Sequence, residues 1–137
     1  MTAHNRKLTE ITFSLDGTEY QAQVKSWKMN NNTDDAEIFF VFEPGEEFAE
    51  AADPSWSLDV TFYADWRSSG IGDFLMSHDE TDVALVLDHH PNVAGEHVRW
   101  SGTIHLKAPN VGGDVRTTEE IDTTLTFVGK PTYARIG

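Results

Sequence analysis

Alternation of apolar and polar side chains dominates this sequence. Four segments place an apolar residue at every second position: Thr9–Leu15, Trp56–Trp66, His97–Lys107 and Glu119–Val128. A period of two is that of a β-strand with one packed face and one solvated face, which is typical of antiparallel sheets. These segments therefore predict strands of an antiparallel sheet.

Shorter signals predict further strands. Asp16-Gly17 separates the first strand from Tyr20–Trp27, and an Asp-Gly pair supplies the positive φ angles of a tight hairpin turn. Ile38–Phe42 is continuously apolar, which predicts a strand covered on both faces. Val83–Leu87 is another apolar run of strand length.

One segment lacks the period of two and predicts a helix. Ile71, Phe74 and Leu75 have the i, i+3, i+4 spacing of a helical apolar stripe, with Ser68 or Ser69 as the expected N-cap. The pattern predicts a mainly β fold, an antiparallel β-sandwich or partly rolled barrel with one short flanking α-helix. We expect a single domain over residues 1–137, with a flexible N-terminal arm at 1–8, an acidic loop at 43–54 and a C-terminal tail at 132–137.

Charge narrows the possible functions. Ten Lys and Arg against 23 Asp and Glu give a formal net charge of −13, and no basic residue lies between Lys28 and Arg67. Such a surface repels phosphate backbones and so argues against nucleic-acid binding. It fits either a solvated acidic surface or a wall that nucleic acid passes without sticking.

Catalytic and metal signatures are weak. The chain contains no Cys, and so no thiolate ligand or cysteine nucleophile. His97 and His105 would lie roughly 26 Å apart on one strand, too far to share an ion. We therefore expect no enzyme, no metal and no cofactor. No apolar run approaches the roughly 18 residues of a membrane-spanning helix, so we expect no membrane contact.

The tryptophans fall into two groups by phase. Trp56, Trp66 and Trp100 occupy apolar positions of the alternation and are expected in the core. Trp27 is out of phase with Tyr20 and is the best candidate for an exposed tryptophan, which would suit an anchor between subunits.

Three C-terminal segments, in their order and spacing, resemble the major tail (tail tube) proteins of long-tailed bacteriophages. The segments are Trp100–Ile104, the Gly-Gly-containing Ala108–Val115, and Ile121–Pro131 with its terminal Gly-Lys-Pro. With the preceding strand, helix and strand, the resemblance covers residues 56–131.

The resemblance implies a structural protein. Members of this family form hexameric rings of β-sandwich subunits that stack into a tube, and each subunit lends strands to an inner β-barrel. The implied partners are other copies of the chain and the tape-measure, tail tip and tail terminator proteins, with DNA passing through unbound. The implied location is the tail of the virion, after synthesis in the host bacterial cytoplasm.

A DNA conduit should be lined with negative charge, because fixed cations would bind phosphates. The candidate lumen-lining residues are Asp59 and Asp65, or alternatively Glu120 and Asp122. The candidate contacts between subunits or rings are the acidic loop, the Asn110–Asp114 loop, the basic N-terminus and the exposed tryptophan. Their residues are Glu46, Glu47, Glu50, Gly112, Gly113, Asp114, Arg6, Lys7 and Trp27. Arg6 and Lys7, with Lys130 and Arg135, could pair with the acidic loop of the next ring.

Two other functions remain open. A small β-sandwich that binds carbohydrate or another ligand would be a stable monomer. Another ring-forming tail component, such as a tail terminator, would give single rings rather than long tubes.

Overall fold

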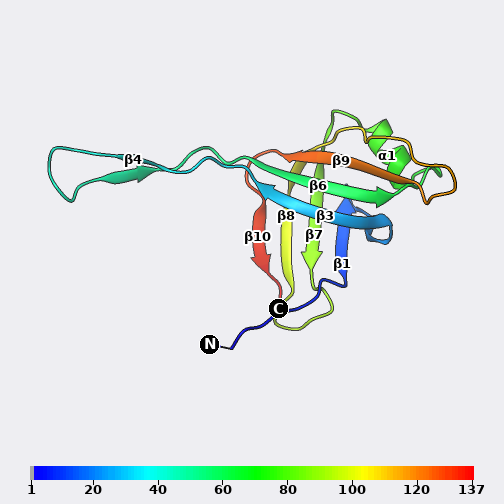
Figure 1. Ribbon diagram of the computed structural model, residues 1–137, viewed down its shortest axis with the longest axis horizontal. Helices are drawn as coiled ribbons and strands as arrows, with labels where there is room; N and C mark the ends of the chain where they lie inside the picture. The colour runs from blue at the N-terminus through cyan, green and yellow to red at the C-terminus, as the bar shows by residue number, and fades with distance from the viewer. Residues whose placement is uncertain (1) are drawn as a thin grey trace.

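Antiparallel strands in two layers form the body of the protein, as a computed structural model describing residues 2–137 shows (Figure 1). One layer contains β2 (Thr18–Glu19), β1 (Ile11–Leu15), β7 (Asp82–His89), β8 (Val98–His105) and β10 (Thr132–Arg135). The other contains β9 (Glu120–Phe127), β6 (Trp56–Tyr63) and β3 (Val24–Asn31). With one short helix, this is the mainly β, antiparallel fold that the alternation predicts.

The two layers are one sheet folded at a corner. β8 pairs with β9 only through Ile104↔Phe127 and His105↔Thr126, whereas it pairs with β7 over its whole length. Because so few residue pairs join the layers, their strands cross in Figure 1 and enclose a core. The sheet does not close into a barrel, since β2 and β3 are its end strands.

The core fills the space between the layers. Phe13 of β1 and Phe62 of β6 meet edge to face, with ring centroids 5.6 Å apart. Each large side chain buried there contributes about 1.5–3 kcal/mol. The fully buried side chains are Phe13, Leu15, Leu58, Phe62, Ile71, Leu75, Leu85, Leu87, Ile104, Leu106, Ile121 and Leu125.

The hairpin at Asp16-Gly17 is confirmed, but its second strand is shorter than predicted. Both turn residues have positive φ, 52° and 83°, and β2 ends at Glu19. The Gln21 side chain then accepts the backbone N–H of Phe13 at 3.2 Å in place of a strand carbonyl. The ladder stops there, and after a 3₁₀ turn (η1, Gln21–Gln23) the chain crosses to the other layer as β3.

The predicted helix is present as α1 (Ile71–Ser77), with Ile71 and Leu75 fully buried. The predicted serine N-cap is wrong, because Gly70 occupies that position. A Cβ at Gly70 would lie 2.6 Å from the backbone oxygen of Asp65. Only glycine allows this close approach, which fixes the start of the helix.

Trp66 is not a core residue, contrary to the alternation. β6 ends at Tyr63, so the period of two no longer determines where Trp66 points. Its indole N–H donates to Glu119 Oε1 at 2.9 Å, and its ring covers Gly72, where a Cβ would come within 2.8 Å of the ring. The other two predicted core tryptophans, Trp56 and Trp100, are only partly buried.

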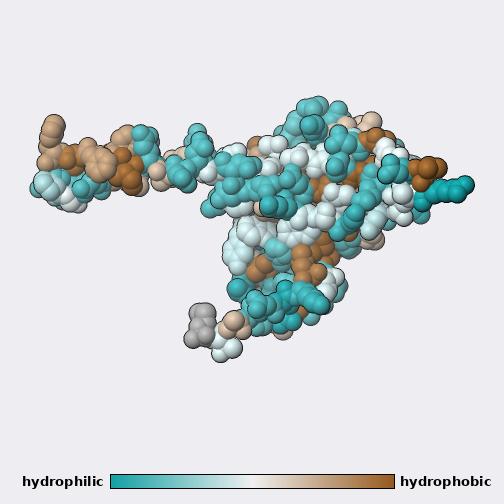
Figure 2. All heavy atoms as spheres, in the orientation of Figure 1, coloured by the Kyte–Doolittle hydropathy of each residue, from teal (hydrophilic) through white to brown (hydrophobic). Residues whose placement is uncertain are grey.

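A long hairpin, hereafter the arm (residues 32–55), projects from the body (Figure 1). It contains β4 (Glu37–Phe39) and β5 (Phe48–Glu50), which pair with each other in a separate sheet. The prediction that Ile38–Phe42 is covered on both faces is wrong: Phe40 is 79 % exposed and Phe42 fully exposed. In Figure 2 the arm carries apolar colour well beyond the body. With only one partner strand and no second layer, the arm has nothing to cover its apolar run.

The chain end also differs from the sequence-based expectation. Most of the predicted tail at 132–137 forms strand β10, which pairs with the first half of β8. The ring of Tyr133 packs on Trp100 with centroids 5.1 Å apart. This aromatic contact holds the C-terminal segment to the sheet.

Candidate functional site

The outward face of β3, β6 and β9 is polar along its whole length. Pairing of Asp59 with Thr124 and of Thr61 with Asp122 places their side chains on the face opposite the core. Asp59 Oδ1 accepts the hydroxyl of Thr124 at 2.7 Å, and its Oδ2 accepts the amide of Asn30 at 2.9 Å. We name this surface the polar face; its outward residues are Ser26, Lys28, Asn30, Ser57, Asp59, Thr61, Tyr63, Glu120, Asp122, Thr124 and Thr126.

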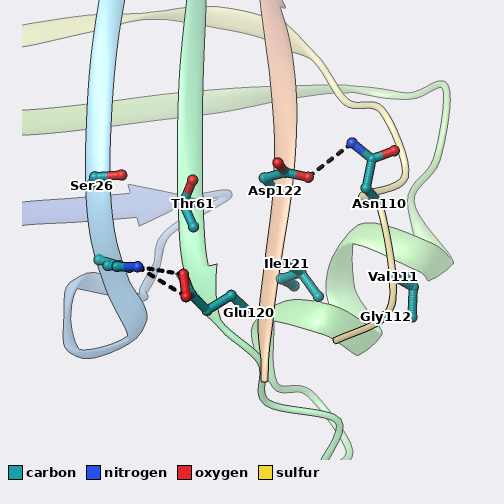
Figure 3. Close-up of a pocket in the computed structure, with 9 residues that line it drawn as sticks. Ser26, Thr61, Asn110, Val111, Gly112, Glu120, Ile121 and Asp122 are labelled. Atoms are coloured by element: carbon teal, nitrogen blue, oxygen red, sulfur yellow. Dashed lines mark hydrogen bonds and ion pairs between the residues drawn. The ribbon is translucent and has the colours of Figure 1, made fainter. Parts of the chain in front are cut away.

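An open pocket lies at one end of the polar face (Figure 3). Lys25 donates to Glu120 at 2.6 Å, and this hydrogen bond raises the pKa of the lysine. On the other side of β9, the side-chain amide of Asn110 donates to Asp122 Oδ1 at 2.8 Å. Each carboxylate of the pocket thus has its own donor, and the arrangement is one of mutually satisfied polar groups.

The structure brings together three of the four candidate lumen residues. Asp59, Glu120 and Asp122 share the polar face, so the two alternative pairs are not separate surfaces. Asp65 lies apart, beyond the end of β6, where both its oxygens accept from Arg67 at 2.9 Å. The hydrogen bonds from Arg67 lower the pKa of Asp65.

The arm holds the predicted acidic contact residues. Glu50 pairs opposite Glu37 across the hairpin, while Glu46 and Glu47 lie in the connection between β4 and β5. The arm carries eight carboxylates and no basic residue: Asp34, Asp35, Glu37, Glu43, Glu46, Glu47, Glu50 and Asp53. Exposed apolar side chains lie among them, so the arm combines negative charge with an uncovered apolar surface.

Trp27 is not the exposed anchor that its phase suggests. A register shift in β3 between Val24 and Ser26 changes the alternation, so that Trp27 points inward opposite Val60. Its ring packs on His89 with centroids 4.7 Å apart and lies against the core cluster. This shift in pairing explains the error, and the alternation in the sequence gives no sign of it.

The remaining predicted contact residues are exposed. Arg6 forms an ion pair with Glu96 in the connection between β7 and β8, and Lys7 is exposed beside it. Gly112, Gly113 and Asp114 lie in an exposed loop before β9. The structure places these two regions apart from the arm of the same chain (Figure 1).

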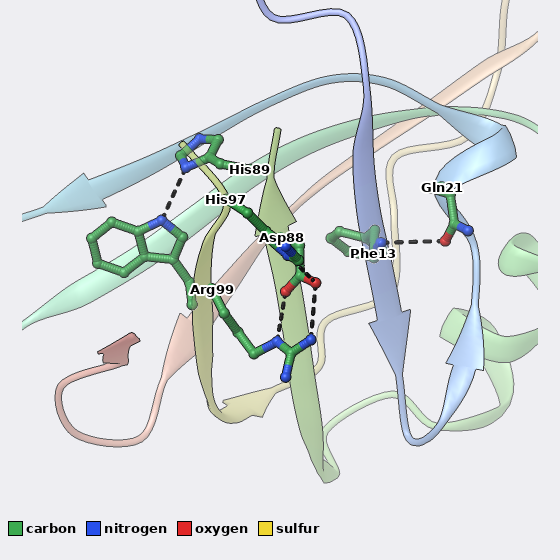
Figure 4. A network of polar contacts seen from close by, with 7 residues as sticks. Phe13, Gln21, Asp88, His89, His97 and Arg99 are labelled. Carbon is green, nitrogen blue, oxygen red and sulfur yellow. Dashed lines mark hydrogen bonds and ion pairs between the residues drawn. The ribbon is translucent and has the colours of Figure 1, made fainter. Parts of the chain in front are cut away.

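Sequence reasoning missed an ionic cluster on the first layer (Figure 4). Asp88 is 4 % exposed and accepts two hydrogen bonds from Arg99 at 2.8 and 3.0 Å, while His97 Nε2 lies 3.0 Å from Asp88 Oδ2. The bonds from Arg99 lower the pKa of Asp88 to about 2. Cross-strand pairing of Asp88 with Arg99 is invisible until the register of β7 and β8 is known.

The histidines are engaged in local contacts rather than gathered around an ion. His105 lies between Glu80 and Asp82, at 2.8 and 2.7 Å, and these hydrogen bonds raise its pKa. Burial lowers the pKa of His89, and the neighbouring His90 lowers it further. Within residues 2–137 no group of three or more His, Cys, Asp or Glu side chains could hold a metal ion.

The sequence matches no protein-family model, and none of the curated proteins matches it. No helix in the part of the chain that the structure describes is both long and apolar enough to cross a bilayer.

Proposed function

We propose that this chain is a structural subunit of a bacteriophage tail tube, which assembles into hexameric rings that stack into a conduit for DNA. The observation that carries the proposal is the polar face, a three-stranded surface without an exposed aliphatic side chain, bordered by an unpaired strand edge. In this proposal the partners are other copies, the tape-measure, tail tip and tail terminator proteins, and passing DNA. The protein would be made in the host cytoplasm and reside in the virion tail.

Free edges support ring formation. β3 pairs with β6 only, so its other edge presents backbone N–H and C=O groups along Val24–Asn31. On the far side of this layer, β9 is paired with β8 over two residues and with Asn110 through one bridge. A strand from a second copy would satisfy these groups, and closing a ring would leave no edge exposed.

Charge on the polar face is only weakly negative. Three carboxylates, Asp59, Glu120 and Asp122, share the surface with Lys28, and Lys25 lies at its end, bound to Glu120. Most of its polar groups are tied to one another, and Lys25, being held by Glu120, would bind phosphates poorly. Six copies per ring would repeat this surface, with its excess of carboxylates over lysines, around the lumen.

A ligand-binding β-sandwich is the second candidate. Partly exposed aromatic rings, those of Trp100 and Tyr133 among them, lie together at one end of the first layer. Such rings can stack on apolar faces of a ligand. A ligand-binding module would remain monomeric, and a matching glycan would raise its melting temperature.

Electron microscopy of negatively stained, concentrated protein tests the proposal, together with light scattering over a wide concentration range. We expect rings, or tubes of stacked rings, and a mass that rises in multiples of six subunits. A protein that stays monomeric at every concentration would overturn the proposal. Rings that never stack would instead support a terminator-like component.

A further inference from the structure

The inward face of the first layer is not covered along its whole length. Burial decreases toward one end of each strand: Leu87 is fully buried but His89 only partly, and Ile104 is fully buried but Trp100 and Val98 only partly. In Figure 1 this end of β1, β7, β8 and β10 extends past β3. We name this partly covered end the aromatic end; it comprises Ile11, His89, Val98, Trp100 and Tyr133, and Trp27 of β3 packs on its His89.

Ring contacts join the aromatic end into one surface. Trp100 lies between His89, with centroids 6.5 Å away, and Tyr133, with centroids 5.1 Å away. Trp56, at the base of the arm, packs on Trp100 at 6.3 Å. Tyr133 is 52 % exposed. Aromatic rings in a half-open cluster are typical anchors of protein interfaces.

One cation lies at the rim of the aromatic end. Arg135 follows Tyr133 by two residues and so shares its side of β10, and its guanidinium donates to the backbone oxygen of Gly95 at 2.7 Å. No carboxylate is paired with Arg135 among the described ion pairs, and two acidic groups of this layer are bound elsewhere: Asp88 to Arg99, and Glu96 to Arg6 and His4. The surface would therefore favour an apolar partner with negative charge.

The arm has this complementary composition. Phe40, Val41 and Phe42 form its exposed apolar tip, and all its charged residues are acidic. The arm projects away from the body, so it does not reach the aromatic end of its own chain (Figures 1 and 2). Another copy of the chain can supply an arm to it.

We propose that the apolar tip of the arm of one copy docks on the aromatic end of a second copy. The inference rests on the proposed function in that both require self-association. Phe40 and Phe42 would stack on Trp100 and Tyr133, and the arm carboxylates would lie beside Arg135. Such a contact is heterologous, since arm and aromatic end are different surfaces, and it therefore propagates from copy to copy.

Disulfide trapping tests the contact, because the described chain has no cysteine to interfere. One preparation carries Glu43→Cys and a second, of different mass through a tag, carries Ile136→Cys. Both positions are exposed and lie beside the proposed contact, so neither substitution opens the core or removes a stacking ring. On mixing under mild oxidation, we expect the mixed disulfide to form about tenfold or more faster than for a matched control pair. The control pairs Glu43→Cys with Val115→Cys, a position 87 % exposed in another loop.

A mixed disulfide no faster than the control would overturn the inference, as would disulfides forming mainly between two arms. Micrographs of the same proteins separate this result from the proposed function. Rings without arm-specific disulfides would leave the tail-tube proposal standing and remove the inference. Arm-specific disulfides in open chains without rings would support the inference and remove the tail-tube proposal.

Discussion

The indole N–H of Trp100 donates a hydrogen bond to Nδ1 of His89 over 3.2 Å. Nδ1 can accept this bond only while it carries no proton, so the pair requires a neutral imidazole. Burial, which lowers the pKa of His89, favours the same state. The aromatic end is thus linked to pH through one histidine.

Lowering the pH should destabilise the fold through this pair. The pKa of His89 is lower in the folded state than its unfolded value of about 6.5, so the unfolded chain binds the proton more readily. Its contribution to stability is complete above that value and declines as pH falls through the folded pKa. Urea unfolding at pH 7.5 and 5.5 measures the loss, and His89→Gln should show a smaller loss than the parent. Equal losses in the two proteins would contradict the assignment.

Removing the carboxylate of Asp88 should cost about 2 kcal/mol at neutral pH, since the pKa of about 2 lies well below the usual value. The folded pKa is depressed, so this contribution is present above about pH 4 and disappears as pH falls toward 2. Chemical unfolding of Asp88→Asn at pH 7 and pH 3 measures both effects. Glu120→Gln, which breaks an exposed pair, is the matched control and should change stability less. A loss for Asp88→Asn as small as the control's would contradict the prediction.

Gly70→Ala should destabilise the protein by about 1–3 kcal/mol, because the added Cβ meets the backbone of Asp65, which cannot easily move. Gly113→Ala is the control, since nothing lies within 4 Å of a Cβ there. Thermal unfolding of both variants measures the difference. Equal melting temperatures would show that the loop before α1 adapts to the methyl group.

Reversing charge on the arm should weaken assembly without weakening the fold. Glu46→Lys with Glu47→Lys places two cations beside the apolar tip, where they would face Arg135 of another copy. Sedimentation should show fewer large assemblies, while the unfolding midpoint stays within about 0.5 kcal/mol of the parent, as expected for surface changes. Unchanged assembly would remove the arm charges from the proposed contact.

Most of the body could be predicted from the sequence, because one packed face imposes alternation. β6, β8 and β9 each lie within a predicted segment, and α1 coincides with the predicted stripe apart from its cap. Alternation determines which face of a strand is covered but not what covers it. The partners of β3 and the corner between β8 and β9 depend on contacts distant in sequence.

The errors have local physical causes. Ile38–Phe42 has the composition of a buried strand, yet burial requires a second layer, and that layer is absent from the described chain. Trp27 lies on the face opposite to the predicted one, because a single shift of register inverts every later position of the strand. The polar residues of β6 and β9 could be predicted one by one. That they form one polar face follows only from the pairing of Asp59 with Thr124, which the sequence does not show.

Because the arm is separate from the core, its sequence can change during evolution with little effect on folding. Every residue of the buried cluster among residues 2–137 lies outside positions 32–55. Lengthening, shortening or recharging this hairpin therefore carries little folding penalty, and selection can tune it through whatever it touches. The arm is the segment in which we expect related chains to diverge first while keeping the same body.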